Sequence, residues 1–241
     1  MNILIVNDDS IYAPGIQLLA QAATQLGKVW VVASAQQCSA MSHKVSIGGI
    51  VHVEKVEDFP VAVECAYKVD GSPADCVKVA MQYLLKEKPD FVFSGINNGF
   101  NVGYEIAYSG TMAAAMEALM YAVPAIAFSN ANNAPMTIAE KYILPVMKEL
   151  TSKQKLTNEV WNVNFPSTET GIPKGILYDR MVAPVWLYNT DYREAKISDT
   201  GVRLEIHGIP ITTAETVPAG TDMEAVLNGY ISIGKVHSAV L

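Results

Sequence analysis

The sequence predicts an α/β fold: a doubly wound, mostly parallel, Rossmann-like sheet with C-terminal β-hairpin extensions. Short apolar runs that suit buried strands alternate with stretches of helical periodicity through about residue 150. Beyond about Trp161 prolines recur, and short alternating stretches replace the helices. We therefore expect a single domain over residues 1–241, with an α/β core at about 1–150 and hairpin and arm extensions at about 160–241.

Strands in the first half are predicted from apolar runs that are too short for helices. In chain order they are Asn2–Val6, Lys28–Ala33, Lys44–Glu57, Ala66–Val69, Phe91–Phe93 and Val123–Phe128. The third and fourth of these runs have partly polar faces and are expected to be half exposed. A long loop rich in glycine and asparagine is expected over Ser94–Tyr108.

Helices are predicted between the strands from apolar residues at helical spacing and from residues that start helices. They cover about 14–26, 72–86, 109–121 and 137–150. Pro14 and Pro73 suit a first helical turn, where the missing N–H loses nothing. Ser72 is the expected N-cap of the second helix, with Asp75 in its first turn, and Ser109 is the expected N-cap of the third.

The last third of the chain is predicted from its alternating pattern. Trp186–Tyr192 and Val202–Ile206 are expected to be strands of extended hairpins, which could serve as arms in assembly. Met223–Leu227 suits a short helix, and Tyr230–Ile233 suits a last strand.

The composition limits the possible classes of protein. Half of the 241 residues are hydrophobic, which is enough for a sizeable core, but no run of about 18 apolar residues occurs. The N-terminus enters an apolar strand without a basic region and cleavage site, so we expect neither a membrane span nor a secretory signal. Cys38, Cys65 and Cys76 are odd in number and lack metal-ligand spacing, which favours a reduced, cytoplasmic protein.

The charge argues against one class of partner. A net charge of -7 and an isoelectric point near 5.1 disfavour binding to a nucleic-acid polymer, whose phosphates need a basic surface. A small phosphorylated substrate is compatible with this charge if a cation or backbone amides meet its phosphate locally.

The segment Asn7-Asp8-Asp9-Ser10 follows directly on the first apolar run. Adjacent carboxylates where a core strand emerges repel each other unless a positive charge lies between them. In a loop both side chains can turn toward one point, and such hard oxygen ligands suit Mg²⁺ or Mn²⁺. A solvated turn is the alternative, because Asn, Asp and Ser are common in turns.

Two further polar loops are expected at the same edge of the sheet, because parallel strands end together there. Ser34–Ser39 follows the second strand, and Ser94–Gly103 follows the strand at Phe91–Phe93. Their hydroxyl and amide oxygens could complete the shell of a divalent ion. A flexible turn is the alternative for the loop at Ser94–Gly103, but loops of this length in compact domains are more often functional.

The segment Tyr108-Ser109-Gly110-Thr111 opens a helix rich in small residues. The free N–H groups and the dipole of a helix start can receive a phosphate. An ordinary capped helix is the alternative. Glu117, further along, is expected on an exposed or hydrogen-bonded side of the helix.

Several common sites are not indicated. The chain has no Gly-x-Gly-x-x-Gly after a strand, no Gly-x4-Gly-Lys-[Ser/Thr] and no Gly-x-Ser-x-Gly, so dinucleotide, P-loop and serine-hydrolase sites are disfavoured. The histidines are scattered without partners at ligand spacing, and His43 lies nearest the candidate site.

Several motifs in fixed order resemble the family of the stationary-phase survival protein SurE, which are metal-dependent 5′-nucleotidases. The motifs are Asn7-Asp8-Asp9, Ala13-Pro14-Gly15-Ile16, Val31-Val32-Ala33, Ser39, Gly71-Ser72-Pro73-Ala74-Asp75-Cys76-Val77, Ser94-Gly95-Ile96-Asn97, Asn101 and Tyr108-Ser109-Gly110-Thr111. They cover the first 130 residues densely, and Gly229–Ile233 also resembles the family's C-terminal segment.

This resemblance implies one divalent metal ion per subunit, Mg²⁺ or Mn²⁺, held by Asp8, Asp9, Ser39 and Asn97. It implies that the two aspartates are catalytic and that phosphate and substrate are bound by Asn97, Asn101, Ser109, Gly110 and Thr111. The family acts on nucleoside 5′- and 3′-monophosphates, some members on short polyphosphate, and its members form homodimers or homotetramers through exchanged C-terminal arms.

The chain departs from the family pattern in four places. Ser10 stands where the family usually has Gly, and it would carry strain if that position needs a positive φ. Ala33-Ser34 replaces Ala-Pro, Gly71-Ser72-Pro73 replaces Gly-Thr-Pro, and Ile233-Gly234-Lys235 stands where Thr-Pro is common. None of these changes removes an expected ligand.

The expected function is that of a metal-dependent phosphomonoesterase that releases phosphate from nucleoside monophosphates. Two alternatives stay open at this point. One is a nucleotide- or phosphate-binding protein with little turnover, which would tolerate loss of the carboxylates. The other is a hydrolase directed at another phosphoester, such as polyphosphate.

Overall fold

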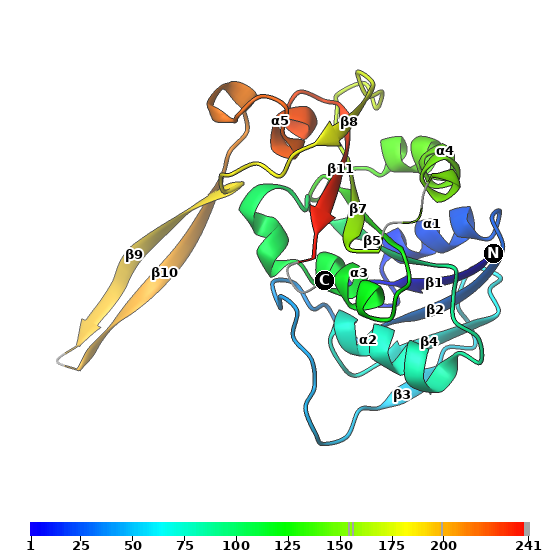
Figure 1. Ribbon diagram of the computed structural model, residues 1–241. Coiled ribbons are helices and arrows are strands. Elements are labelled where there is room, and N and C mark those ends of the chain that lie inside the picture. The colour runs from blue at the N-terminus through cyan, green and yellow to red at the C-terminus, as the bar shows by residue number, and fades with distance from the viewer. Residues whose placement is uncertain (154, 156, 199, 239–241) are drawn as a thin grey trace.

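A computed structural model describes residues 1–153, 155, 157–198 and 200–238. In this part of the chain a nine-stranded sheet forms the centre of the molecule (Figure 1). Its spatial order is β3 (Val53–Lys55), β4 (Cys65–Val69), β2 (Lys28–Ser34), β1 (Asn2–Val6), β5 (Phe91–Asn98), β6 (Ala125–Asn130), β7 (Glu159–Phe165), β11 (Ile231–His237) and β8 (Ile176–Arg180).

The sheet is mostly parallel, as the sequence predicts. Neighbouring strands from β4 through β7 all pair in parallel, whereas β3 and β11 run antiparallel to β4 and β7. Strand β1 lies near the middle with Ile3, Leu4, Ile5 and Val6 fully buried. A strand buried on both faces needs an uninterrupted apolar run, and the sequence supplies one.

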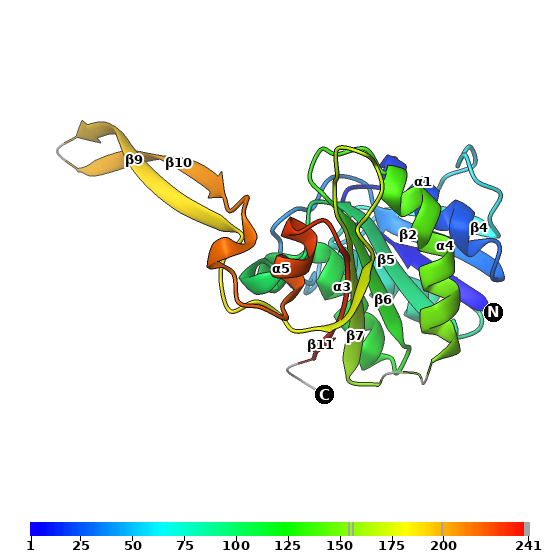
Figure 2. The same ribbon diagram turned by 90° about the horizontal axis from the view of Figure 1, so that it is seen from above.

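Helices cover both faces of the sheet (Figures 1 and 2). On one face α1 (Pro14–Ala23) and α4 (Thr137–Ser152) pack over Ile3 and Ile5 of β1. On the other, α2 (Pro73–Val79) and α3 (Gly110–Met120) pack over Leu4 and Val6. Because successive strand residues face opposite sides, β1 contributes to two separate cores.

The predicted helix starts are confirmed. The Ser72 hydroxyl accepts from the N–H of Asp75 at 3.1 Å, and the Asp75 carboxylate accepts from the N–H of Ser72 at 2.9 Å, which completes a capping box. The Ser109 hydroxyl accepts from the N–H of Met112 at 3.0 Å. The second helix is shorter than predicted, because a π-helical turn at Ala80–Leu84 follows α2.

Two predictions for the first half are wrong, and two strands of the second half, β7 and β8, were not predicted. The run at Lys44–Glu57 contains only the three-residue β3, because only these residues find a partner in β4. The expected loop at Ser94–Tyr108 instead continues β5 to Asn98, paired with the end of β6 after a bulge, and then forms a 3-10 helix at Gly103–Tyr108. Strand β7 was not expected, although its residues from Val160 on are buried.

The C-terminal extension contains the predicted hairpin. Strands β9 (Tyr188–Ser198) and β10 (Gly201–Pro210) form a two-stranded arm that projects away from the sheet (Figures 1 and 2). The arm is longer than the predicted strands at 186–192 and 202–206. A 3-10 turn at Ala214–Thr216 leads to the predicted short helix, α5 (Asp222–Leu227), and then to β11, which rejoins the main sheet.

Among the described residues, no helix has both the length and the apolar character needed to cross a membrane.

Gly15, in the first turn of α1, provides a test of the packing between α1 and β5. A Cβ atom at this position would collide with the backbone oxygen of Ile96. We expect Gly15→Ala to lower the free energy of unfolding by roughly 1–3 kcal/mol, measured by urea denaturation. Gly201 has open space around its Cα, so Gly201→Ala should change it by less than about 0.5 kcal/mol. Equal stability of the two variants would contradict this account of the packing.

Candidate active site

Asn7 fixes the loop that leaves β1. Its side chain is fully buried and donates to the backbone oxygen of Gly95 in β5 at 3.2 Å. Its amide oxygen accepts from the N–H of Asp9, and its backbone oxygen accepts from the hydroxyl of Ser34 at 3.3 Å. One asparagine therefore ties β1 to the strands on both sides. The sequence places Asn7 at the end of the first strand, but its role in joining the neighbouring strands was not predicted.

The turn after the two aspartates has an unusual backbone conformation. Ser10 has a φ of 89°, in the region that favours glycine. The expectation that a non-glycine residue here carries backbone strain therefore fits the structure. The turn directs Asp8 and Asp9 to different surroundings.

Asp8 faces the start of α3. Its carboxylate is buried and accepts from the hydroxyl of Thr111 at 2.6 Å. Gly110 lies against it so closely that a Cβ atom there would be 2.9 Å from the Asp8 Cβ and 3.0 Å from its Oδ2. Only glycine lets the helix start approach the carboxylate in this way.

Burial raises the pKa of Asp8 from 3.8 to about 7. The hydrogen bond from Thr111 acts in the opposite direction, and the negative charge of Asp9 adds to the rise. The ionised form of Asp8 is therefore poorly compensated by the protein itself, so a cation at this point would be favourable.

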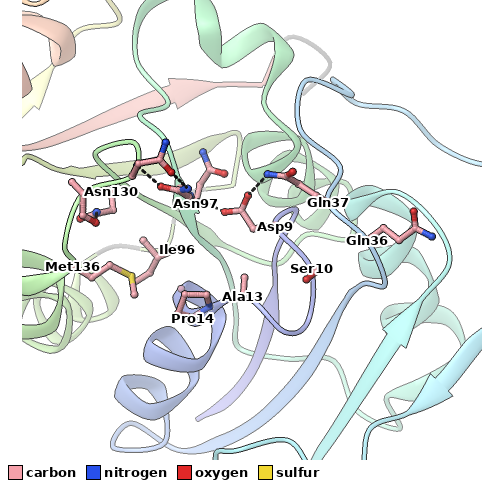
Figure 3. A pocket seen from close by; sticks show the side chains of 14 residues that line it. Asp9, Ser10, Ala13, Pro14, Gln36, Gln37, Ile96, Asn97, Asn130 and Met136 are labelled. Atoms are coloured by element: carbon pink, nitrogen blue, oxygen red, sulfur yellow. Dashed lines mark hydrogen bonds between the residues drawn. The ribbon is translucent and has the colours of Figure 1, made fainter.

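Asp9 faces a pocket at the carboxyl edge of the sheet (Figure 3). Its Oδ2 accepts from the backbone N–H of Asn98 at 2.7 Å, and its Oδ1 accepts from the Gln37 amide at 3.4 Å. The extension of β5 beyond its predicted end thus supplies a backbone donor to the carboxylate. Gln37, on the loop after β2, was not predicted as a site residue.

The pocket has a volume of about 540 Å³, within the usual range for small-molecule sites. Asn97 lines it beside Asp9, and the Asn97 amide nitrogen donates to the backbone oxygen of Gly99 at 2.8 Å. This hydrogen bond fixes the amide and directs its nitrogen to the protein, so its oxygen is the atom that can serve as a metal ligand.

Two other predicted site residues, Ser39 and Asn101, do not line this pocket. Ser39 is exposed and follows Cys38, whose N–H donates to the backbone oxygen of Asp8 at 2.7 Å. Asn101 is buried in an amide network, and its side chain donates to the hydroxyl of Ser129 at 2.7 Å. Its predicted contact with substrate stays a prediction.

His43 and Glu117 form a separate pair. Glu117 is buried and lies 2.9 Å from the His43 ring nitrogen, with the Lys78 ammonium 3.9 Å away. Of the two expected settings for Glu117, the structure shows the hydrogen-bonded one.

The donor set suits a hard divalent cation. In the described part of the chain no group of three or more His, Cys, Asp or Glu side chains could hold a metal ion. A site at Asp8 and Asp9 would therefore be completed by neutral oxygens, those of Asn97, Ser39 or water. Two carboxylates with such ligands match the preferences of Mg²⁺ and Mn²⁺ rather than those of zinc.

Comparison with known proteins gives one family. The family model described as "Survival protein SurE" matches residues 3–186. A protein named 5′-nucleotidase SurE from Flavobacterium psychrophilum is 37% identical over 98% of this chain and 91% of its own length. One of the same name from Clostridium botulinum is 36% identical over 98% and 93%. The crystal structure of the SurE protein from Aquifex aeolicus superposes with a TM-score of 0.84 and 32% identity, covering 100% of this chain and 95% of that one.

The raised pKa of Asp8 leads to a prediction for the metal-free protein. Between about pH 4 and about pH 7 the unfolded chain has released this proton and the folded chain retains it, so stability falls as pH rises. In EDTA, Asp8→Asn should therefore raise the free energy of unfolding more at about pH 8 than at about pH 5. The two changes should differ by on the order of 2–4 kcal/mol.

Urea denaturation of both proteins at the two pH values measures this difference. Asp58→Asn, at an exposed turn, is the matched control and should behave like the unchanged protein at both. A stability difference between Asp8→Asn and the unchanged protein that does not vary with pH would contradict the assignment of the buried charge.

Proposed function

This chain belongs to the SurE family. We propose that it is a metal-dependent phosphomonoesterase acting on nucleoside 5′-monophosphates and, as the sequence motifs imply, on 3′-monophosphates. The names of its relatives support nucleotidase activity. The observation that carries the proposal for this chain is the contact of Asp8 with the start of α3, beside Asp9 and Asn97.

Asp8, Asp9, Asn97 and Ser39 are the residues that would hold Mg²⁺ or Mn²⁺, one ion per subunit. Such an ion, when bound, polarises phosphoryl oxygens and lowers the pKa of a bound water. The chain's own contribution is the position of these oxygens at one edge of the sheet, where the charge of a phosphate is met locally in an acidic protein.

The start of α3 is the proposed phosphate site. The first N–H groups of a helix have no partner within the helix, and Ser109 caps one of them by accepting from Met112. Gly110 and Thr111 lie beside Asp8, and the backbone N–H of Thr111 also hydrogen-bonds the Asp8 carboxylate. The N–H of Gly110 is therefore the donor that we propose to stabilise charge on the phosphoryl oxygens, with Thr111 holding Asp8 beside it. Asp9, which lines the pocket, is the carboxylate placed to accept a proton from an attacking water.

The arm supports the further proposal that the protein is a homodimer or homotetramer. Val202, Leu204 and Ile206 alternate along β10. Ile197 of β9 lies opposite Val202, and a register shift after Arg203 places Tyr192 opposite Ile206. All five side chains are exposed. A two-stranded hairpin with one apolar face is marginally stable in water by itself, so a second subunit is the natural partner for this face.

The activity is tested by phosphate release from AMP with Mn²⁺, with Mg²⁺ and with EDTA. We expect release with either ion and none above background with EDTA. Asp9→Asn should reduce kcat/KM by at least about 100-fold because it removes a charged ligand and the proposed base, and Asp58→Asn should have no effect. Full activity of Asp8→Asn or Asp9→Asn at saturating Mn²⁺ would refute the metal assignment.

A substrate panel separates the alternatives. It contains 5′-AMP, 3′-AMP and short polyphosphate. Release from polyphosphate alone would favour the other phosphohydrolase, and nucleotide binding without release would favour a binding protein.

The role of the arm is tested by the mass in solution. Ile206→Glu places a charge on the apolar face of the arm, so light scattering should show a smaller assembly or a larger dissociation constant for the subunits. Arg203→Glu changes the charge on the opposite face and should leave the mass unchanged. A monomer for the unchanged protein at high concentration would refute the proposal.

A further inference from the structure

We propose that the pocket beside Asp9 binds the nucleoside part of the substrate, and that the segment 130–136 selects it. This inference rests on the proposed function, because the phosphate is taken to lie at Asp8, Asp9 and the start of α3. The pocket continues from that point, since Asp9 and Asn97 are part of its wall. A phosphate group by itself would not require a cavity of about 540 Å³.

The chemistry of the wall favours a neutral ligand. Among the described residues that line the pocket, Asp9 is the one charged side chain. Figure 3 shows Asn97, Asp9 and Gln37 along one rim, whereas the apolar side chains gather on another side. The apolar group consists of Ala13, Pro14, Ile96 and Met136. A polyphosphate would need several cations here, but a nucleoside offers a flat apolar face and hydrogen-bonding edges.

The segment 130–136 forms one wall of this pocket and is held in place by hydrogen bonds. The Asn130 amide donates to the backbone oxygens of Ala131 and Ala134, each at 3.2 Å, which closes the turn. The N–H of Asn133 donates to the amide oxygen of Asn98 at 2.8 Å, and the amide of Asn98 donates back at 3.2 Å. The segment is thus fastened to the end of β5, next to Asn97.

One acceptor in this wall has no partner. Asn130 is only 3% exposed, and its amide oxygen makes no hydrogen bond with any described group. A buried acceptor without a partner is costly, so a donor from a ligand, directly or through a water, would be favourable here. Nucleobases and ribose carry such donors.

A second aromatic pocket is the rival site for the base. Trp186 lies between Tyr104 and Tyr108, with ring centroids 5.0 and 5.8 Å away, beside a cavity of about 390 Å³ at the base of the arm. None of the proposed metal ligands lines that cavity. Its lining includes the first residues of the arm, Tyr188 to Thr190, rather than the edge of the sheet that carries Asp9. We therefore assign the nucleoside to the pocket beside Asp9.

The test introduces tryptophan at one lining position of the segment and, as a control, at an exposed neighbouring position. Ala134→Trp fills the pocket, and Asn132→Trp places the same ring at an exposed neighbouring position outside the lining. For Ala134→Trp, the ratio of kcat/KM for AMP to kcat/KM for methyl phosphate should fall at least about tenfold, because only AMP carries a nucleoside. Asn132→Trp and Trp186→Ala should keep the ratio within about twofold.

Binding of adenosine in EDTA gives a readout that is independent of turnover. In the unchanged protein, the methyl NMR signal of Met136 should shift during the titration, and that of the exposed Met120 should not. This measurement holds even if Ala134→Trp fails to fold.

The outcomes separate the two proposals. Adenosine binding that shifts Met136, with no phosphate release from any nucleotide, would refute the proposed activity and support the pocket. Phosphate release from AMP with an unaltered ratio in folded Ala134→Trp, or with a loss confined to Trp186→Ala, would overturn the pocket and leave the activity standing.

Discussion

The placement of the Asp8 carboxylate against the start of α3 is the constraint on which the site depends. Burial of the Asp8 charge costs several kcal/mol, and repulsion by the negative charge of the adjacent Asp9 adds to this cost. The dipole of a helix start contributes at most about 2 kcal/mol, and the hydrogen bond from Thr111 about 1.5–3 kcal/mol. These contributions leave Asp8 with a pKa of about 7, so the protein's own groups do not fully compensate its charge. A divalent cation is the partner that would complete the balance.

Close contacts that need glycine bring the parts of the site together. Gly110 lets α3 touch Asp8, and Gly15 lets α1 approach the backbone of Ile96. Ile96 and the start of α1 both line the pocket, so this second contact shapes its apolar side. Asn7 holds the loop after β1 in place by hydrogen bonds to the strands on either side, β5 and β2. Asp8 and Asp9 therefore stand in a loop that is tied to its neighbouring strands, and Asn97 stands on β5 itself.

Sequence reasoning identified the features that depend on local chemistry. The apolar run of β1 and the caps Ser72 and Ser109 follow from residues near each other in the chain, and the gathering of polar loops at one edge follows from the edge rule of parallel sheets. The contact of Asp8 with the start of α3 was not predicted, because that helix start follows no strand end in the chain. The extension of β5 was missed because its glycines and asparagines suggest a loop, whereas pairing with β6 decides it.

The length of the arm and the position of β7 were likewise beyond the local pattern. Strand β7 is set by its two neighbours in the sheet, β6 and β11, and the second of these lies about 70 residues further along the chain. The roles of Gln37 and Asn130 were also missed. An isolated amide has many uses, and only the surrounding fold shows which one applies.

The 3-10 helix at Gly103–Tyr108 connects the arm with the proposed phosphate site. Glu105 accepts from the N–H groups of Leu187 and Tyr188 at 3.0 and 3.2 Å, where the arm begins. Asp222 of α5 accepts from the N–H groups of Gly103 and Ala183 at 3.1 and 2.9 Å. Each carboxylate joins this segment to the extension by hydrogen bonds to backbone. The next residue after the segment is Ser109, the cap of α3, so the base of the arm and the helix start that borders Asp8 are held in one connected frame.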